Sequence, residues 1–206
     1  MTSVWHPVEV TPVPQSAVPE SNLVIPASTP VKLEIPNLSF DSSTLAGGTS
    51  NSIQQWTKAM NDANKGEAEP PKPWHSSLVW DSTVAGGGLF GTDAQSSGRI
   101  LAHVTPWSWD KDKQGAFQHL RNVRTGNPVV ITTKKGRLCY NVVKSDSVLK
   151  PQINVVYGKD VVVQGIVYLI TCDRPENYGE GATTHNLVVT LRLNQQQTNT
   201  GSCAQV

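Results

Sequence analysis

The sequence predicts an all-β protein, folded as a closed eight-stranded β-barrel with two short helices in its connections. Short apolar runs rich in β-branched residues recur along the chain, and the strongest is Ile166–Cys172. Pro128–Thr133 and Arg137–Val143 flank Lys134-Lys135-Gly136 in the pattern of a hairpin. Closing a set of short strands on itself removes their exposed edges, so a small barrel is the expected architecture.

Three regions are expected along the chain. Residues 1–29 form a proline-rich extended arm, because closely spaced prolines favour extended backbone with no hydrogen-bond ladder of its own. Residues 30–193 hold the barrel strands. Residues 194–206 form a polar tail rich in glutamine and threonine.

The first half of the barrel region predicts two strands and one helix. Val31–Ile35 alternates apolar and charged residues as a half-buried strand does, and Pro36 ends it. Ser52–Gln55 has the form of a capping box and opens a short amphipathic helix that Gly66 stops. Leu78–Trp80 is a short strand.

The second half supplies the remaining elements. Ala85–Gly88 is glycine-rich but lacks the lysine and following helix of a phosphate loop, so it is interpreted as a turn. Arg99–Val104 is a strand, and Ala116–Val123 is a second short helix stopped by Gly126. After the hairpin, Val161–Cys172 is an almost unbroken strand run that Pro175 prevents from continuing. Asn186–Leu193 is the last strand.

Composition excludes several kinds of function. With 17 basic and 16 acidic residues among 206, and no basic block, nucleic acid is not an expected partner. The three cysteines, Cys139, Cys172 and Cys203, are odd in number and irregularly spaced, which is typical neither of a disulfide framework nor of a zinc site. No cofactor or metal is expected.

The sequence shows no eighteen-residue apolar run and no charged start followed by an apolar segment. We therefore expect neither a membrane span nor a signal peptide, and a chain that is cytoplasmic as synthesised.

Two residues stand at the ends of apolar strands and are candidates for chemistry. Cys172 ends its strand, where it is either a small buried hydrophobe, as most unpaired cysteines are, or a nucleophile. A cysteine nucleophile needs a partner that favours its thiolate, and histidine is the usual one. Of the five histidines, only His103 also ends an apolar strand. The two side chains are expected to meet at one mouth of the barrel.

The order of these features resembles the sortase family. Sortases show a leucine-x-threonine-cysteine signature at the end of a late strand, and here Leu169-Ile170-Thr171-Cys172 stands there. Their histidine ends an earlier strand in a context similar to Leu101-Ala102-His103. Leu33–Pro36 is similar to the first strand of the actinobacterial, class E or D-like branch. The resemblance covers residues 31–193.

The resemblance implies a cysteine transpeptidase or thiol peptidase that needs no cofactor. Cys172 would attack a peptide bond after threonine in a sorting peptide and form a thioacyl enzyme. His103 would protonate the leaving amine and later accept a proton from an incoming amine. Thr171 would help to shape the peptide groove.

The chain departs from the family at its third catalytic position. Sortases carry an arginine at the start of the last strand, where this chain has His185 or Asn186. Arg174, two residues beyond the thiol, is the remaining cationic candidate for stabilising the oxyanion or positioning the substrate.

A second departure is that no membrane anchor is recognised. The two departures together favour a borrowed fold, in a phage or cytoplasmic relative whose chemistry is weakened or lost. The alternative to a weakened enzyme is an inactive structural or binding protein on a sortase barrel, for example a phage virion component. In that case the arm and the tail would contact neighbouring protein subunits.

Overall fold

The computed structural model describes residues 23–36, 54–56, 78–82, 84–104, 115–153, 162–173 and 183–203, of which 54–56 are described by their backbone alone. Within these ranges the chain forms one eight-stranded sheet, with seven strands in a nearly closed barrel and a three-residue strand added at one edge. This confirms the all-β barrel expected from the sequence.

The strands in chain order are β1 (Pro30–Glu34), β2 (Gln54–Trp56), β3 (Val79–Asp81), β4 (Gly98–Leu101), β5 (Pro128–Thr133), β6 (Gly136–Leu149), β7 (Ile166–Cys172) and β8 (His185–Leu193). The helices of the described residues are the short 3₁₀ turns η2 (Ala85–Gly88), η3 (Leu120–Asn122) and η4 (Lys150–Gln152), and the α-helix α2 (Gln195–Thr200).

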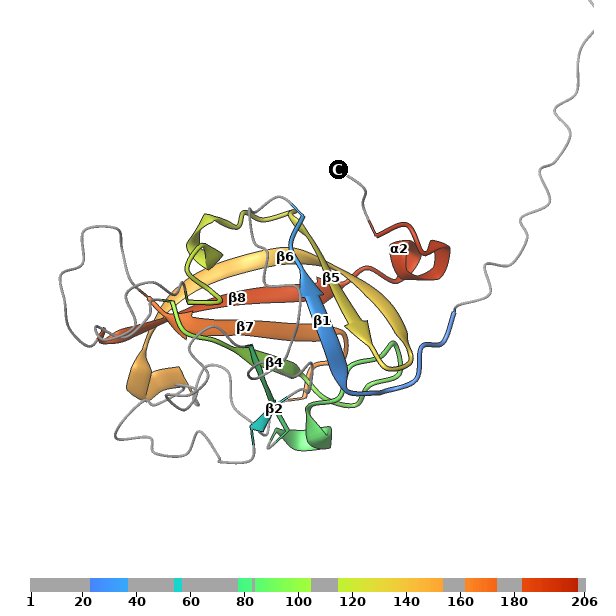
Figure 1. Cartoon of the computed structure of the whole chain (residues 1–206), viewed down its shortest axis with the longest axis horizontal. Coiled ribbons are helices and arrows are strands. Elements are labelled where there is room, and N and C mark those ends of the chain that lie inside the picture. Colours follow the sequence, from blue (N-terminus) through green and yellow to red (C-terminus); the bar gives the residue numbers. More distant parts are fainter. Residues whose placement is uncertain are drawn as a thin grey trace, which may run out of the picture.

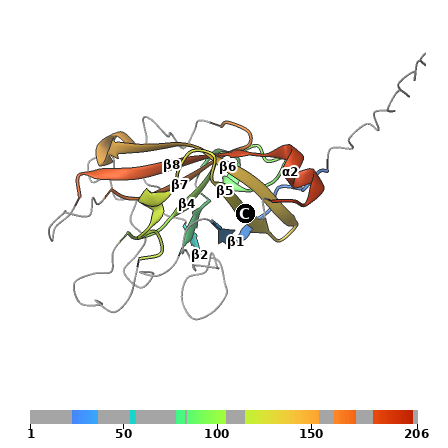
Figure 2. The same ribbon diagram turned by 90° about the horizontal axis from the view of Figure 1, so that it is seen from above.

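The sheet runs in the order β1-β5-β6-β8-β7-β4-β3-β2, and β8 lies between β6 and β7 in Figure 1. Most neighbours are antiparallel, whereas β4 pairs with β7, and β2 with β3, in parallel. The sheet curls, so that in Figure 2 the two edge strands β1 and β2 lie in the lower part of the picture, opposite β6 and β8. An antiparallel bridge between Ser28, which precedes β1, and Phe90, which lies between β3 and β4, joins the two edges of the sheet.

The sheet has two faces with separate apolar clusters. The inner cluster includes Ile100, Leu169 and Val189 and fills the barrel. The outer cluster is formed by Val79, Leu101, Val148, Ile153, Ile170 and Val188, with Tyr168 packed against it. Since side chains alternate along a strand, β4, β7 and β8 each contribute to both clusters. This explains why β7 is an almost continuous apolar run.

A bulge in β6 changes which residues of that strand face inward. Tyr140 and Val142 belong to the inner cluster, and the register then shifts between Val142 and Lys144. Beyond the bulge, Ser147 pairs with Leu187 on the inner side and Val148 joins the outer cluster. One extra residue therefore decides which β6 side chains reach each face.

Two expectations about helices are wrong in the described residues. Gln54–Trp56, which the capping-box pattern assigned to a helix, is the strand β2, while the rest of that predicted helix lies outside the described residues. The segment 116–123 contains only the 3₁₀ turn η3 rather than an α-helix. An α-helix occurs instead at α2, where Asn194 accepts a hydrogen bond from the backbone of Gln197 and Gly201 ends the helix with a φ of 67°.

The expected strand from Val161 is also too long. Val162 and Val163 are each 42% exposed and stand outside β7, which begins at Ile166. Gly165, with a φ of 72°, closes a turn in which the Ile166 amide donates to the Val163 carbonyl over 3.2 Å. The valine run is therefore divided by a turn before the buried strand.

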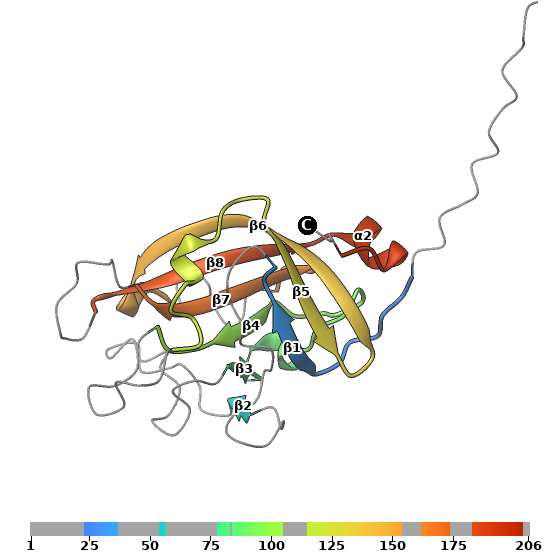
Figure 3. The same ribbon diagram turned by 45° about the horizontal axis from the view of Figure 1, so that its top comes forward.

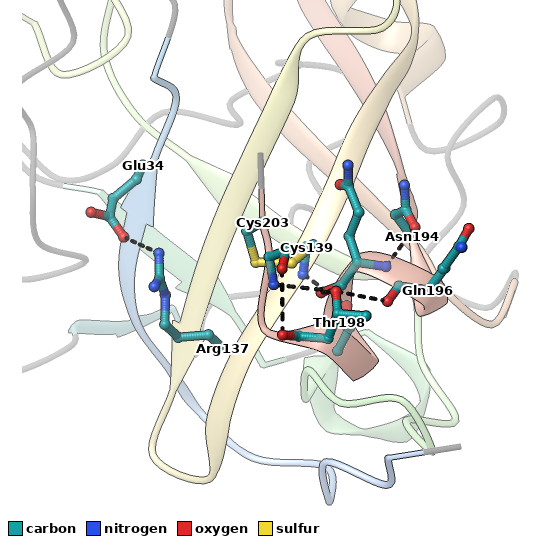
Figure 4. Close-up of a disulfide and its surroundings, with 10 residues drawn as sticks. Glu34, Arg137, Cys139, Asn194, Gln196, Thr198 and Cys203 are labelled. Carbon is teal, nitrogen blue, oxygen red and sulfur yellow. Dashed lines mark hydrogen bonds and ion pairs between the residues drawn. A yellow bond between two sulfur atoms is a disulfide. The ribbon is translucent and has the colours of Figure 1, made fainter. Parts of the chain in front are cut away.

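The expectation of no disulfide is wrong. Cys139 of β6 and Cys203 are joined across 64 residues of sequence (Figure 4). The Cys139 amide also donates to Thr198 Oγ1 over 3.0 Å, and the Asn194 amide donates to the Cys139 carbonyl over 2.7 Å. The segment treated as a polar tail is thus fixed to the barrel wall.

Candidate functional site

Cys172 ends β7, between β4 and β8, and it is the one cysteine of the chain whose sulfur is not part of the disulfide. Ile170 precedes it by two residues and lies in the outer cluster, so alternation puts the Cys172 side chain on the outer face as well. The side chain is partly exposed. Cys172 is therefore held at the end of a rigid strand, in a partly exposed position.

His103 follows β4 by two residues at the same end of the sheet. The parallel register pairs Leu101 with Ile170, and the Ala102 amide continues the ladder by donating to the Ile170 carbonyl over 3.2 Å. One further step sets His103 beside Cys172, and alternation puts it on the face of Leu101. The structure thus brings the two strand ends together.

Thr171 locks this alignment. Its hydroxyl donates to the Ala102 carbonyl over 2.7 Å, and both residues are buried. This hydrogen bond joins the residue before the cysteine to the residue before the histidine. Thr171 therefore lies under the candidate site as a cross-link between β7 and the end of β4.

The register separates the two candidates on the last strand. Asn186 pairs directly with Cys172, and directly opposed residues of an antiparallel pair share a face. His185 lies on the opposite side of β8, where its ring bonds with Thr184 Oγ1 over 2.9 Å. Asn186 is 2% exposed, and its Nδ2 has no hydrogen-bond partner in the described part of the chain. Arg174 lies outside the described residues.

Two further rows of side chains cross the same outer face. Next to the row of His103, Cys172 and Asn186 is an apolar row that includes Leu101, Ile170 and Val188. Beyond it is a polar row in which buried Arg99 and Asp81 form an ion pair of 3.7 Å. Tyr168 pairs with Arg99 in register. Burial raises the pKa of the Tyr168 hydroxyl, and the Arg99 charge opposes that shift.

The sequence reasoning missed a polar contact directly after the thiol. Asp173 is 8% exposed, and its carboxylate accepts hydrogen bonds from Arg121 Nη2 and Ser147 Oγ. The Asp173 amide donates to the His185 carbonyl over 2.9 Å. No short-range pattern links residues 52 and 26 positions away, so the sequence offered no signal for these partners.

Comparison with known proteins identifies the family of the chain. The sequence profile of the Sortase domain family matches residues 91–194, which include β4, β7 and β8. The chain belongs to the sortase family. Among curated proteins, none matches the sequence.

Solved sortase structures resemble this one in fold. The SrtA sortase from Actinomyces oris is 13% identical, with a TM-score of 0.51 over 82% of this chain and 85% of that one. Sortase C2 of Group B Streptococcus Pilus Island 1 is 22% identical, with a TM-score of 0.37 over 48% of this chain and 50% of that one. Sortase A from Corynebacterium diphtheriae is 20% identical, with a TM-score of 0.37 over 48% and 41%. This chain thus spans half or less of the latter two sortases.

In the described ranges, no three His, Cys, Asp or Glu side chains gather in a way that would hold a metal ion. No helix of those ranges has the length and apolar character needed to cross a bilayer.

Proposed function

We propose that this sortase is a cysteine transpeptidase or peptidase that acts through a thioacyl intermediate on Cys172. The observation that supports it is the single row at the end of the outer sheet face, where β4, β7 and β8 align His103, Cys172 and Asn186. A nucleophile, an acid–base group and a hydrogen-bond donor on one rigid edge are the parts that acyl transfer needs.

The steps follow from these three groups. The Cys172 thiolate attacks the carbonyl carbon of the scissile peptide, the carbon–nitrogen bond breaks, and protonated His103 gives its proton to the leaving amine. A second amine then attacks the thioester, His103 accepts its proton, and the thiolate is released. With water in place of the amine, the same steps give hydrolysis.

Asn186 is the donor that we assign to the carbonyl oxygen during attack. Its buried Nδ2 has no hydrogen-bond partner in the described ranges, which is costly unless a ligand supplies one. The carboxamide stands where the family resemblance calls for an arginine, so it offers a hydrogen bond without a fixed charge. Arg174, two residues after the thiol, is a second candidate donor.

The substrate in this proposal is a threonine-containing sorting peptide, and the acceptor is a peptide or protein amine. Assignment to the class E or D-like branch, and origin in a phage, remain proposals that rest on the sequence pattern alone.

The test is to trap the thioacyl enzyme. The protein is incubated with a panel of threonine-containing pentapeptides and analysed by intact-mass spectrometry, with hydroxylamine as an acceptor in parallel samples. We expect an adduct in the parent and none in Cys172→Ala. His103→Ala should react about 10²- to 10⁴-fold more slowly, whereas Arg192→Gln, an exposed change on the same last strand, should react like the parent.

The alternative of an inactive sortase-fold structural protein has its own support in Asn186, which replaces the expected arginine with a neutral side chain. If the parent forms no adduct with any peptide of the panel, this alternative replaces the enzyme.

A further inference from the structure

Segment 115–123 packs into the barrel interior and is hydrogen-bonded to His103. Ala116, Phe117 and Leu120 are buried in the inner cluster, and the Phe117 amide donates to the His103 carbonyl over 2.9 Å. The turn η3 is therefore fixed both to the barrel interior and to the candidate histidine. Arg121 belongs to this turn.

Asp173 connects that turn to the strand of the thiol. Its carboxylate is bound by Arg121 from η3 and by Ser147 from β6, and its amide is bound to β8. Asp173 continues the alternation of Thr171, so it lies on the inner side of β7 while Cys172 lies on the outer side. Three elements thus fix the residue that follows the cysteine.

The Arg121–Asp173 ion pair affects the charge near Cys172 more than it affects stability. The Arg121 side chain is 44% exposed, and such pairs typically add little to stability. Asp173, however, is nearly buried and directly follows Cys172 in the chain, so a carboxylate without a counter-charge there would disfavour the thiolate even from the other side of β7. The Arg121 guanidinium cancels that charge permanently.

We propose that the Arg121–Asp173 ion pair is a positioning device for Cys172. It holds the end of β7 against segment 115–123, which is hydrogen-bonded to His103, and it keeps the carboxylate of the residue after Cys172 neutralised. This inference deepens the proposed function and rests on Cys172 being the nucleophile. Arg121 acts through Asp173 and is not assigned contact with substrate.

Within the described ranges, the elements around β7 carry other charged and titratable side chains. Among them are His103 after β4, His185 of β8, Arg124 beside η3, and the Asp146–Lys144 ion pair of 2.8 Å on β6. These groups are unchanged in all the variants below, so differences among the variants report the Arg121–Asp173 pair.

The test measures the reactivity of Cys172 across pH. Iodoacetamide labelling is followed by mass spectrometry without reductant, and since Cys139 and Cys203 are joined, the signal belongs to Cys172. Arg121→Gln should raise the midpoint of labelling by about 0.5 to 1 pH unit, the effect of one unbalanced charge nearby. Arg121→Lys and the double variant Arg121→Gln with Asp173→Asn should return it to the parent value.

The outcomes separate this inference from the proposed function. The positioning role of the ion pair is overturned if the labelling midpoint of Cys172 does not move in Arg121→Gln. It is also overturned if the midpoint rises equally in Arg121→Lys, or if the rise persists in the double variant. Thermal unfolding of each variant is measured in parallel, because a purely structural role would lower stability and leave the labelling midpoint in place. Labelling needs no peptide substrate, so absence of the thioacyl adduct would refute the proposed function while this comparison still gives its own answer.

Discussion

Asn186 combines a buried amide that lowers the stability of the fold with a proposed role as hydrogen-bond donor to the substrate. It is nearly fully buried opposite the thiol, with an amide nitrogen that has no partner in the described ranges. The sequence predicted that His185 or Asn186 would replace the arginine, but it did not decide between them. The answer depends on which of the two residues pairs with Cys172, because neighbouring residues of a strand lie on opposite faces. That register is set by contacts distant in sequence.

Replacing Asn186 by leucine should separate activity from stability. The free energy of unfolding should stay equal or rise, because an unsatisfied buried amide is removed, while the rate of adduct formation should fall about 100-fold or more through loss of a donor. Urea denaturation and adduct kinetics measure the two effects. Thr190→Val, four residues further along the same face of β8, is the matched control and should leave the kinetics unchanged. A loss of stability without loss of rate would show that the amide serves the fold.

The strands were predictable and their connections were not, for different physical reasons. Alternation and β-branched runs located β1, β4, β5, β7 and β8 to within a few residues, because burial on one or both faces dictates those patterns. The α2 helix was missed, although Asn194 and Gly201 are suitable caps, because a glutamine- and threonine-rich segment lacks an apolar stripe. Its stability comes instead from the disulfide and from Thr198.

Breaking the Cys139–Cys203 disulfide should detach α2. A closed loop of 64 residues contributes about 4 kcal/mol in the chain-entropy model, so Cys203→Ser should lower the free energy of unfolding by up to that amount. The loss should be visible in denaturant titration and in faster hydrogen exchange at the Cys139 amide, which is bound to Thr198. The labelling midpoint of Cys172 should stay at the parent value, because α2 follows the far end of β8. It is measured on the proteolytic peptide that contains Cys172, since Cys139 is also a thiol in this variant. A moved midpoint would contradict this independence of the two ends.

At the scale of the whole barrel, a polar hydroxyl is buried inside the apolar core. Tyr140 of β6 is 2% exposed within the inner cluster, opposite Val129 of β5, and burial raises the pKa of its hydroxyl well above the ordinary value of 10.0. The fold therefore favours the neutral form. The sequence could predict that the Tyr140 strand is part of the barrel, but not which side of β6 faces inward beyond the bulge.

Alkaline pH should destabilise the barrel through this residue. Because the folded pKa of Tyr140 is raised, its contribution is fully present below about pH 10 and is lost as pH rises further, by at most about 1.4 kcal/mol per pH unit. Urea denaturation between pH 8 and pH 11 should therefore show a steeper decline for the parent than for Tyr140→Phe. Equal slopes would mean that the Tyr140 hydroxyl ionises without opening the core.

The position of α2 also determines how the barrel could be attached to anything else. Leu23 and α2 are tied together, since the Leu23 amide donates to Asn199 Oδ1 over 3.1 Å and Gln195 Nε2 donates to the Leu23 carbonyl over 3.3 Å. Figure 3 shows the blue start of the described chain beside α2, at the end of the barrel remote from the start of β8. The nine residues of β8 separate α2 from Cys172 by about 30 Å. A linker, a surface or a partner joined at either end of the described chain would therefore lie at one end of the barrel, and Cys172 would lie at the other end.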